Sequence, residues 1–194
     1  MRVGVLALQG AVQEHERALA RCGASASQVR LPSDLAGLDG LIFPGGESTV
    51  MALYLREYGL DVAIRARVAS GLALFGLCAG AIILCEEVDG APGPLGLLPA
   101  RATRNFYGRQ LASFEDDIET DLGPFHGIFI RAPRLEALGE TRVIGRRRAG
   151  GSNGSVGEAV LLRRGRILAG SFHPELSGDD RIHEFFLGMV AGRG

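Results

Sequence analysis

The sequence predicts an α/β protein in which a mostly parallel sheet is covered by helices on both faces, in three layers. Short apolar runs alternate with helical patterns through the first half of the chain. The runs are continuous rather than alternating, as in strands that are buried on both faces of a parallel sheet. The length of 194 residues fits one domain, so we expect residues 1–194 to form a single unit.

The individual elements follow from the apolar pattern and from the residues that interrupt it. Gln9 and Gly10 end the first apolar run, and Gly23 ends the helical pattern that comes next. Ser48 is placed to cap a later helix. The predicted strands of this part are 3–8, 28–31, 41–43 and 72–75, and the predicted helices are 11–22, 50–58 and 81–87.

The pattern changes at about residue 97, where short β-like runs are separated by Gly, Asn and Asp. Residues 149–154 are too rich in glycine for a helix or strand interior and predict a flexible hairpin or loop. We interpret the arginine run 146–148 as a solvated loop rather than as a docking patch for a partner. The predicted short strands are 128–130, 142–144, 159–162 and 167–169, and a last helix spans 180–190.

Composition excludes several classes of function. Lys+Arg 21 against Asp+Glu 22 gives a net charge of −1, which argues against a nucleic-acid binder. Every basic residue is arginine, so a lysine Schiff base and a phosphate-loop lysine are impossible. No apolar run approaches the roughly 18 residues of a membrane span, and the N-terminus lacks a signal-peptide layout. Three cysteines without framework spacing indicate a reducing compartment, so we expect a cytoplasmic protein.

Cys78 stands in a Gly-x-Cys-x-Gly turn between a predicted strand and a predicted helix. Flanking glycines remove Cβ clashes around a nucleophile that adopts a strained backbone conformation. A helix that starts at the sulfur favours the thiolate, and its free N–H groups can stabilise an oxyanion. The alternative is that Cys78 is a small buried apolar residue, as we expect Cys22 and Cys85 to be.

A cysteine nucleophile needs a base and a group that orients the base. His173 follows a predicted strand and precedes Pro174 and Glu175. Because the carboxyl ends of parallel strands meet at one edge of a sheet, we expect His173 to lie near Cys78. Pro174 restricts the turn, so that Glu175 can hold one imidazole nitrogen. His-Pro-Glu alone is typical of a surface turn, but the combination favours a Cys78-His173-Glu175 triad.

These two segments, residues 75–80 and 171–176, resemble the two halves of a class I, triad-type glutamine amidotransferase. More narrowly, the chain is similar to the glutaminase subunits of pyridoxal 5'-phosphate synthase, the PdxT family. The resemblance extends over nearly the whole chain and implies a flavodoxin-like sheet of the class I amidotransferase type. The further matching segments are 4–12, 41–49, 104–110 with 113–115, and 129–133.

The resemblance implies hydrolysis of L-glutamine to glutamate and ammonia through a thioester on Cys78, without a metal or cofactor. The implied oxyanion donors are the backbone N–H groups of Gly46 and Ala79. An arginine can pair with the substrate α-carboxylate and Glu47 with the ammonium, although surface ion pairs and helix capping stay open as alternatives. The residues implied to hold glutamine are Gly46, Glu47, Ser48, Arg104, Ile130 and Arg131.

Ammonia is useful only if it reaches an acceptor, and one domain without lysine offers no site for sugar-phosphate chemistry. The resemblance implies that a PdxS-type synthase subunit supplies this chemistry, from ribose 5-phosphate and glyceraldehyde 3-phosphate. Gln9, Gly10 and His15 are implied to lie at the interface with that partner. The alternative for them is a plain strand-helix turn with a solvated helix face. His126 has no role that its surroundings in the sequence assign.

Three other functions stay open at the level of sequence. The chain could serve a different synthase, such as the one of the histidine pathway, although residues 104–110 argue against it. It could be a non-catalytic regulatory subunit on the same fold, in which case Cys78 would be dispensable. It could also be a cysteine hydrolase of the related stress-protein type, which would need neither a partner nor the His-x-Glu segment.

Overall fold

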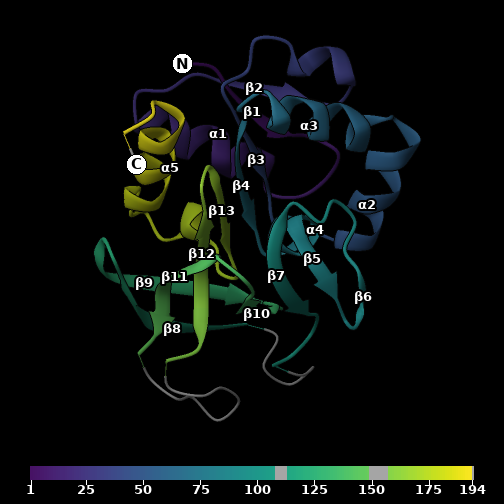
Figure 1. Ribbon diagram of the computed structural model, residues 1–194. Helices are drawn as coiled ribbons and strands as arrows, with labels where there is room; N and C mark the ends of the chain where they lie inside the picture. Colours follow the sequence, from purple (N-terminus) through teal and green to yellow (C-terminus); the bar gives the residue numbers. More distant parts are fainter. Residues whose placement is uncertain (108–112, 149–156, 194) are drawn as a thin grey trace.

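The computed structural model describes residues 1–107, 113–148 and 157–193. Within these residues, nine strands form a central mixed sheet in the order β2-β1-β3-β4-β13-β12-β11-β8-β9 (Figure 1). The first five are parallel and the last four continue the sheet in antiparallel fashion. The parallel strands are β2 (Ala26–Val29), β1 (Val3–Leu6), β3 (Gly40–Phe43), β4 (Ala73–Leu77) and β13 (Ile167–Gly170). The antiparallel strands are β12 (Ala159–Arg164), β11 (Arg142–Arg147), β8 (Ser113–Thr120) and β9 (Gly123–Ile130).

Helices cover both faces of the parallel strands, which confirms the predicted α/β class (Figure 1). Helices α1 (Val12–Arg21) and α5 (Arg181–Val190) pack on one face. Helices α2 (Ser48–Glu57), α3 (Leu60–Ala69) and α4 (Ala79–Leu84) pack on the other. Successive residues of the strands therefore enter different cores: Leu41 and Phe43 of β3 lie in the core with α2, α3 and α4, and Ile42 lies in the core with α1 and α5. Both faces being buried explains why the strands read as continuous apolar runs.

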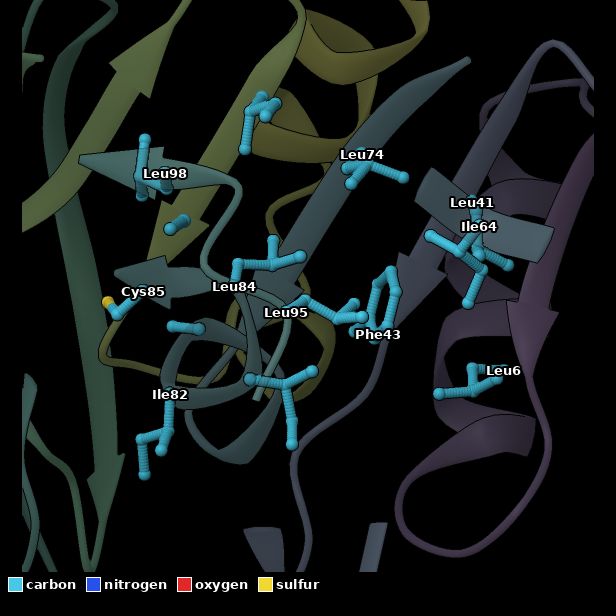
Figure 2. Packing of buried hydrophobic residues seen from close by; sticks show 14 of the residues in the cluster. Leu6, Leu41, Phe43, Ile64, Leu74, Ile82, Leu84, Cys85, Leu95 and Leu98 are labelled. Atoms are coloured by element: carbon cyan, nitrogen blue, oxygen red, sulfur yellow. The ribbon is translucent and has the colours of Figure 1, made fainter. Parts of the chain in front are cut away.

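A second, four-stranded sheet lies beside α4, in the order β10-β7-β5-β6. Figure 2 shows how the core between the sheets is filled, with Phe43 and Leu74 of the central sheet, Leu84 of α4 and Leu98 of the second sheet. The side chains of these four residues are fully buried. The strands are β10 (Arg134–Ala137), β7 (Leu98–Thr103), β5 (Cys85–Val88) and β6 (Ala91–Pro92), and the 3-10 helices are η1 (Pro32–Leu35) and η3 (Pro174–Leu176).

Several elements differ from the sequence-based expectation. The helix predicted over 81–87 spans Ala79–Leu84, because the backbone becomes extended at Cys85 and residues 85–88 pair with β7. Helix α3 was not predicted, since only Leu60 and Ile64 of its ten residues are buried and the apolar pattern is weak. The cap of α2 is Glu47 rather than Ser48, because the Glu47 carboxylate accepts hydrogen bonds from the first turn.

The antiparallel part holds the largest departures. Residues 113–130 form the β8–β9 hairpin, of which only 128–130 were predicted as a strand. Arg147 does not lie in a solvated loop but is buried at the end of β11, where Asp116 and Glu158 pair with its guanidinium. The loop predicted over 149–154 lies outside the described residues. None of the helices in the described ranges is long and apolar enough to cross a membrane.

Candidate active site

Four segments meet at the carboxyl edge of the parallel strands, where active sites of open α/β sheets form. They follow β1, β3, β4 and β13, which are neighbours in the sheet. The segment after β3 carries Gly45 and Gly46, the segment after β4 begins with Cys78, and the segment after β13 carries His173. The pairing of Gly170 with Leu77 places the ends of β13 and β4 side by side. Residues far apart in the sequence are thus brought together.

Cys78 occupies a sharp turn between β4 and α4, with φ 49° and ψ −104°. A non-glycine residue with positive φ is strained, and such strain is concentrated at functional sites. The Cys78 N–H donates to the Gly170 carbonyl at 2.8 Å, which holds the turn against β13. A Cβ on Gly80 would collide with the Phe43 carbonyl, and one on Gly76 would lie 2.6 Å from the Gly80 carbonyl oxygen. Both glycines are therefore required for the backbone to pass so closely.

His173 and Glu175 form a short buried pair next to Cys78. Nδ1 of His173 lies 2.7 Å from Oε1 of Glu175, and the side chains are 8% and 0% exposed. The His173 N–H donates to the Ile128 carbonyl at 2.8 Å, and a Cβ on Gly45 would collide with the imidazole ring. With Nδ1 bound to Glu175, Nε2 is left for the sulfur, and it has no hydrogen-bond partner in the described chain. The ring is therefore packed against Gly45 and oriented by the carboxylate.

The electrostatics of this pair favour a charged histidine. Burial lowers the pKa of His173, but interaction with the Cys78 sulfur and the Glu175 carboxylate outweighs it, and the pKa rises to about 10. Burial raises the pKa of Glu175, but its hydrogen bond with His173 and the nearby His15 prevail and leave it lowered. The arrangement therefore supports an imidazolium next to an ionised carboxylate, which is the setting in which a neighbouring cysteine acts as a nucleophile.

The other two cysteines lack such surroundings. Burial raises the pKa of the Cys22 thiol to about 11 and that of the Cys85 thiol to about 12. All three cysteines are free thiols. The Cys78 sulfur instead lies 3.6 Å from the Ile130 carbonyl oxygen, at the end of β9. Among the three, Cys78 alone stands beside an imidazole, so it is the nucleophile candidate.

A cavity of about 390 Å³ opens over Cys78. His173 and Glu175 line it together with Cys78. All the residues expected to hold glutamine line it too, as do both expected oxyanion donors: Gly46, Glu47, Ser48, Ala79, Arg104, Ile130 and Arg131. The structure therefore brings into one cavity the residues that the sequence singled out from five separate segments.

The Gly46–Glu47 segment is held from two sides. The Glu47 carboxylate accepts from the N–H groups of Thr49 and Val50, at 3.0 and 2.8 Å, and these bonds lower its pKa although burial opposes them. The Gln9 side chain donates to the Glu47 carbonyl at 2.8 Å and accepts from the Glu47 N–H at 3.1 Å. The Gly46 N–H has no acceptor among the described residues. The segment is thus fixed with one free donor beside the nucleophile.

The two arginines of the cavity differ in their partners. Arg104 donates through Nε to Asp89 at 2.6 Å and through a guanidinium N–H to Thr49 at 3.3 Å. Arg131 has positive φ, 46°, and no carboxylate partner within the described residues. Of the segment 104–110, residues 108–110 lie outside the described ranges. Within the described part of the chain, Arg131 is therefore the cation of the cavity that has no carboxylate partner, and Arg104 is anchored at the rim.

Of the residues expected at a partner interface, Gly10 lines the cavity and Gln9 lies next to it. The position of His15 differs from the expectation, because its side chain is fully buried and is not available for a surface contact. The cause is that α1 turns this residue toward Glu175, whose Oε1 lies 3.8 Å from Nε2 of His15. His126 is exposed on β9 and pairs with Glu115 of β8 at 2.8 Å. This exposed pair differs from the buried pair of His173 and Glu175.

Several residues around the site could not be predicted from the sequence. Asp89, which holds Arg104, lies in a turn with positive φ and has no motif. His183 of α5 is fully buried against His15. The contact between His15 and His183 could not be predicted, since nothing in a single sequence links the two positions. No group of three His, Cys, Asp or Glu in the described ranges could hold a metal ion.

Known proteins match the chain over nearly its whole length. The sequence profile of the SNO glutamine amidotransferase family matches residues 5–192. The pyridoxal 5'-phosphate synthase subunit PdxT of Thermus thermophilus is 53% identical, over 97% of this chain and 97% of the relative. The PdxT subunit of Acidothermus cellulolyticus is 48% identical, over 99% and 95%.

A solved structure agrees with these sequence matches. A crystal structure of a glutamine amidotransferase has a TM-score of 0.89 to this chain at 49% identity, covering 97% of this chain and 98% of the other. The resemblance of residues 75–80 and 171–176 to a glutamine amidotransferase is therefore confirmed. The chain belongs to the SNO glutamine amidotransferase family.

Proposed function

We propose that this chain is the glutaminase subunit of a pyridoxal 5'-phosphate synthase. It hydrolyses L-glutamine to glutamate and ammonia at Cys78 and delivers the ammonia to a PdxS-type synthase subunit. The observation that carries the proposal is the geometry at the sheet edge, where the strained Cys78, the buried His173 and Glu175 share one cavity. Family membership and the PdxT relatives support the same function.

The reaction proceeds in two stages on the same three residues. The Cys78 thiolate attacks the carboxamide carbon, a C–S bond forms, and the carbonyl oxygen takes the negative charge. The N–H groups of Gly46 and Ala79 stabilise this oxyanion. The tetrahedral intermediate collapses as His173 gives its proton to the departing nitrogen, which leaves as ammonia with a thioester behind. Water then attacks the thioester while His173 accepts a proton, and glutamate leaves as the C–S bond breaks.

Glu175 takes no proton in this cycle. Its carboxylate holds Nδ1–H of His173, so that Nε2 is aimed at the sulfur and the imidazolium is stabilised. The buried position keeps this interaction strong, because water does not screen it.

The remaining residues of the cavity bind the amino-acid end of glutamine. Arg131 is the partner of the α-carboxylate, since its guanidinium is free of other carboxylates in the described chain. Arg104 contributes from the rim while it stays paired with Asp89. The Glu47 carboxylate uses some of its lone pairs to cap α2 and offers the rest to the substrate ammonium. Ser48 and Ile130 complete the walls.

The partner docks at the rim formed by Gln9 and Gly10. Gln9 holds the backbone of Glu47 directly beside the oxyanion donor Gly46. A partner that contacts Gln9 therefore acts on the oxyanion site, and we expect the isolated subunit to be nearly inactive. The synthesis that consumes the ammonia, from ribose 5-phosphate and glyceraldehyde 3-phosphate, belongs to the partner, since this chain has no lysine to bind a sugar phosphate covalently. Catalysis by a free thiol fits a reducing cytoplasm.

Ammonia release from glutamine tests the proposal, with and without the synthase subunit. We expect turnover with the partner, little without it, and none for Cys78→Ala, whereas Cys22→Ala keeps wild-type turnover. Full turnover by Cys78→Ala would refute the mechanism, and equal rates with and without the partner would refute activation. If the chain supports imidazole glycerol phosphate synthesis and not pyridoxal 5'-phosphate synthesis, the assigned partner is wrong.

A further inference from the structure

Two histidines behind the triad have no part in the reaction described above. His15 of α1 and His183 of α5 are both fully buried. Nδ1 of His15 and Nε2 of His183 are 3.0 Å apart, and Nε2 of His15 is 3.8 Å from Oε1 of Glu175. A row of side chains therefore leads from the nucleophile through His173 and Glu175 to the far helix. Burying two imidazoles is costly unless their polar atoms are used.

Both histidines are held neutral. Burial lowers the pKa of His15, and burial lowers that of His183 to about 3. The charged and titratable groups that act on His15 are Glu175 and His173 from the segment after β13 and Glu14 from α1. Those that act on His183 are His15, Glu175, Asp180 and Arg21. A neutral imidazole carries one N–H and one lone pair, so the orientation of the two protons can be worked out.

The Glu175 carboxylate decides between the two possible arrangements. If Nδ1 of His15 donated to His183, the lone pair on Nε2 of His15 would face a negative carboxylate oxygen 3.8 Å away. If Nε2 of His183 donates instead, Nδ1 of His15 accepts, and its N–H is on Nε2, directed at the carboxylate. The second arrangement replaces a repulsion with an attraction in a site of low dielectric. In this arrangement the buried N–H of His15 faces the negative carboxylate of Glu175.

We propose that His15 is a positioning residue for Glu175, and that His183 fixes the tautomer in which His15 directs its Nε2–H at the carboxylate. The inference rests on the triad proposed above. His15 touches neither substrate nor sulfur and acts through Glu175, which in turn orients His173. Its N–H keeps the buried carboxylate ionised and directed at Nδ1 of His173, and so raises kcat without contributing to the binding of glutamine.

Two substitutions of His15 separate this role from simple packing. The amide nitrogen of His15→Gln reaches the place of Nε2 and still donates toward Glu175, whereas that of His15→Asn reaches only the place of Nδ1. The two variants are alike in polarity and both remove the ring. In the complex with the synthase subunit, we expect His15→Asn to lower kcat for glutamine roughly tenfold with KM unchanged within about twofold. We expect His15→Gln to retain kcat within about threefold.

Equal losses of kcat in the Gln and Asn variants would overturn the inference, as would a change confined to KM. His183 supplies a second test should the His15 variants fail to fold. His183→Gln keeps a donor toward Nδ1 of His15 and retains most of kcat, whereas His183→Leu lowers kcat several-fold. Equal kcat for the two His183 variants would count against the tautomer.

Glu175→Gln, assayed in parallel, separates failure of this inference from failure of the triad. If Glu175→Gln keeps wild-type kcat, then the triad itself is wrong. If Glu175→Gln is inactive and both His15 variants match the wild type, the triad stands and His15 has no positioning role.

Discussion

Two regions of the molecule hold a histidine beside a glutamate at almost the same distance. In the turn after β13, His173 and Glu175 are 2.7 Å apart, and on the β8–β9 hairpin His126 and Glu115 are 2.8 Å apart. The first pair has side chains 8% and 0% exposed, the second 55% and 64%. In both places the partner raises the pKa of the histidine. A short contact alone therefore does not make a catalytic pair; burial and a third reactive group beside the ring are needed.

The largest expected contrast is in catalysis. Glu175→Gln should lower kcat for glutamine in the synthase complex by roughly 10²–10⁴-fold, because the imidazole loses its orientation and the charge that stabilises its protonated form. Glu115→Gln, the matched change in the exposed pair, should leave kcat unchanged. Ammonia release at saturating glutamine measures both. If the two variants behave alike, the distinction between the pairs is wrong.

A second contrast concerns packing around two glycines, Gly80 beside the active site and Gly188 in α5. Gly80→Ala should lower the free energy of unfolding by about 1–3 kcal/mol, because its Cβ would collide with the Phe43 carbonyl behind Cys78. Gly188→Ala, in α5 with nothing within 4 Å of its Cβ, should raise it by about 1 kcal/mol through helix propensity. Urea unfolding checks both. If the Gly80→Ala protein is as stable as the wild type, the turn between β4 and α4 tolerates a side chain at this position, contrary to the prediction.

A smaller contrast concerns the pH dependence of stability. His183 has a folded-state pKa of about 3 against an ordinary value of 6.5, so it stabilises the fold above pH 6.5, and this stability is lost as the pH falls toward 3. The slope is at most about 1.4 kcal/mol per pH unit, and His183→Leu should flatten the curve in this range. His126 has a raised pKa and works in the opposite direction: its stabilisation is present below pH 6.5 and is lost as the pH rises through the folded-state value.

Solvent screening makes the effect of His126 small, and His126→Gln should leave the curve nearly unchanged. Urea unfolding at a series of pH values decides the matter. Identical pH slopes for the wild type and His183→Leu would contradict the assignment of a buried neutral His183.

The same comparison shows what could be predicted from the sequence. The position of the active site could be predicted, because continuous apolar runs locate buried parallel strands and the carboxyl ends of such strands meet at one edge of the sheet. The β8–β9 hairpin was largely missed because Asp116 points inward, where Arg147 pairs with it, and a buried ion pair breaks the apolar alternation of a strand. The contact between His15 and His183 could not be predicted, since only the tertiary structure brings α1 and α5 together.

In the proposed mechanism Cys78, alone of the three cysteines, is the nucleophile. Treating the complex with a diazoketone analogue of glutamine and locating the label by peptide mass spectrometry checks this assignment. We expect one label, on Cys78, whose formation glutamine blocks in parallel with the loss of ammonia release. Cys22 and Cys85, whose pKa values are raised to about 11 and about 12, should remain unlabelled. Inactivation with the label on another residue, or full activity with Cys78 labelled, would contradict the account.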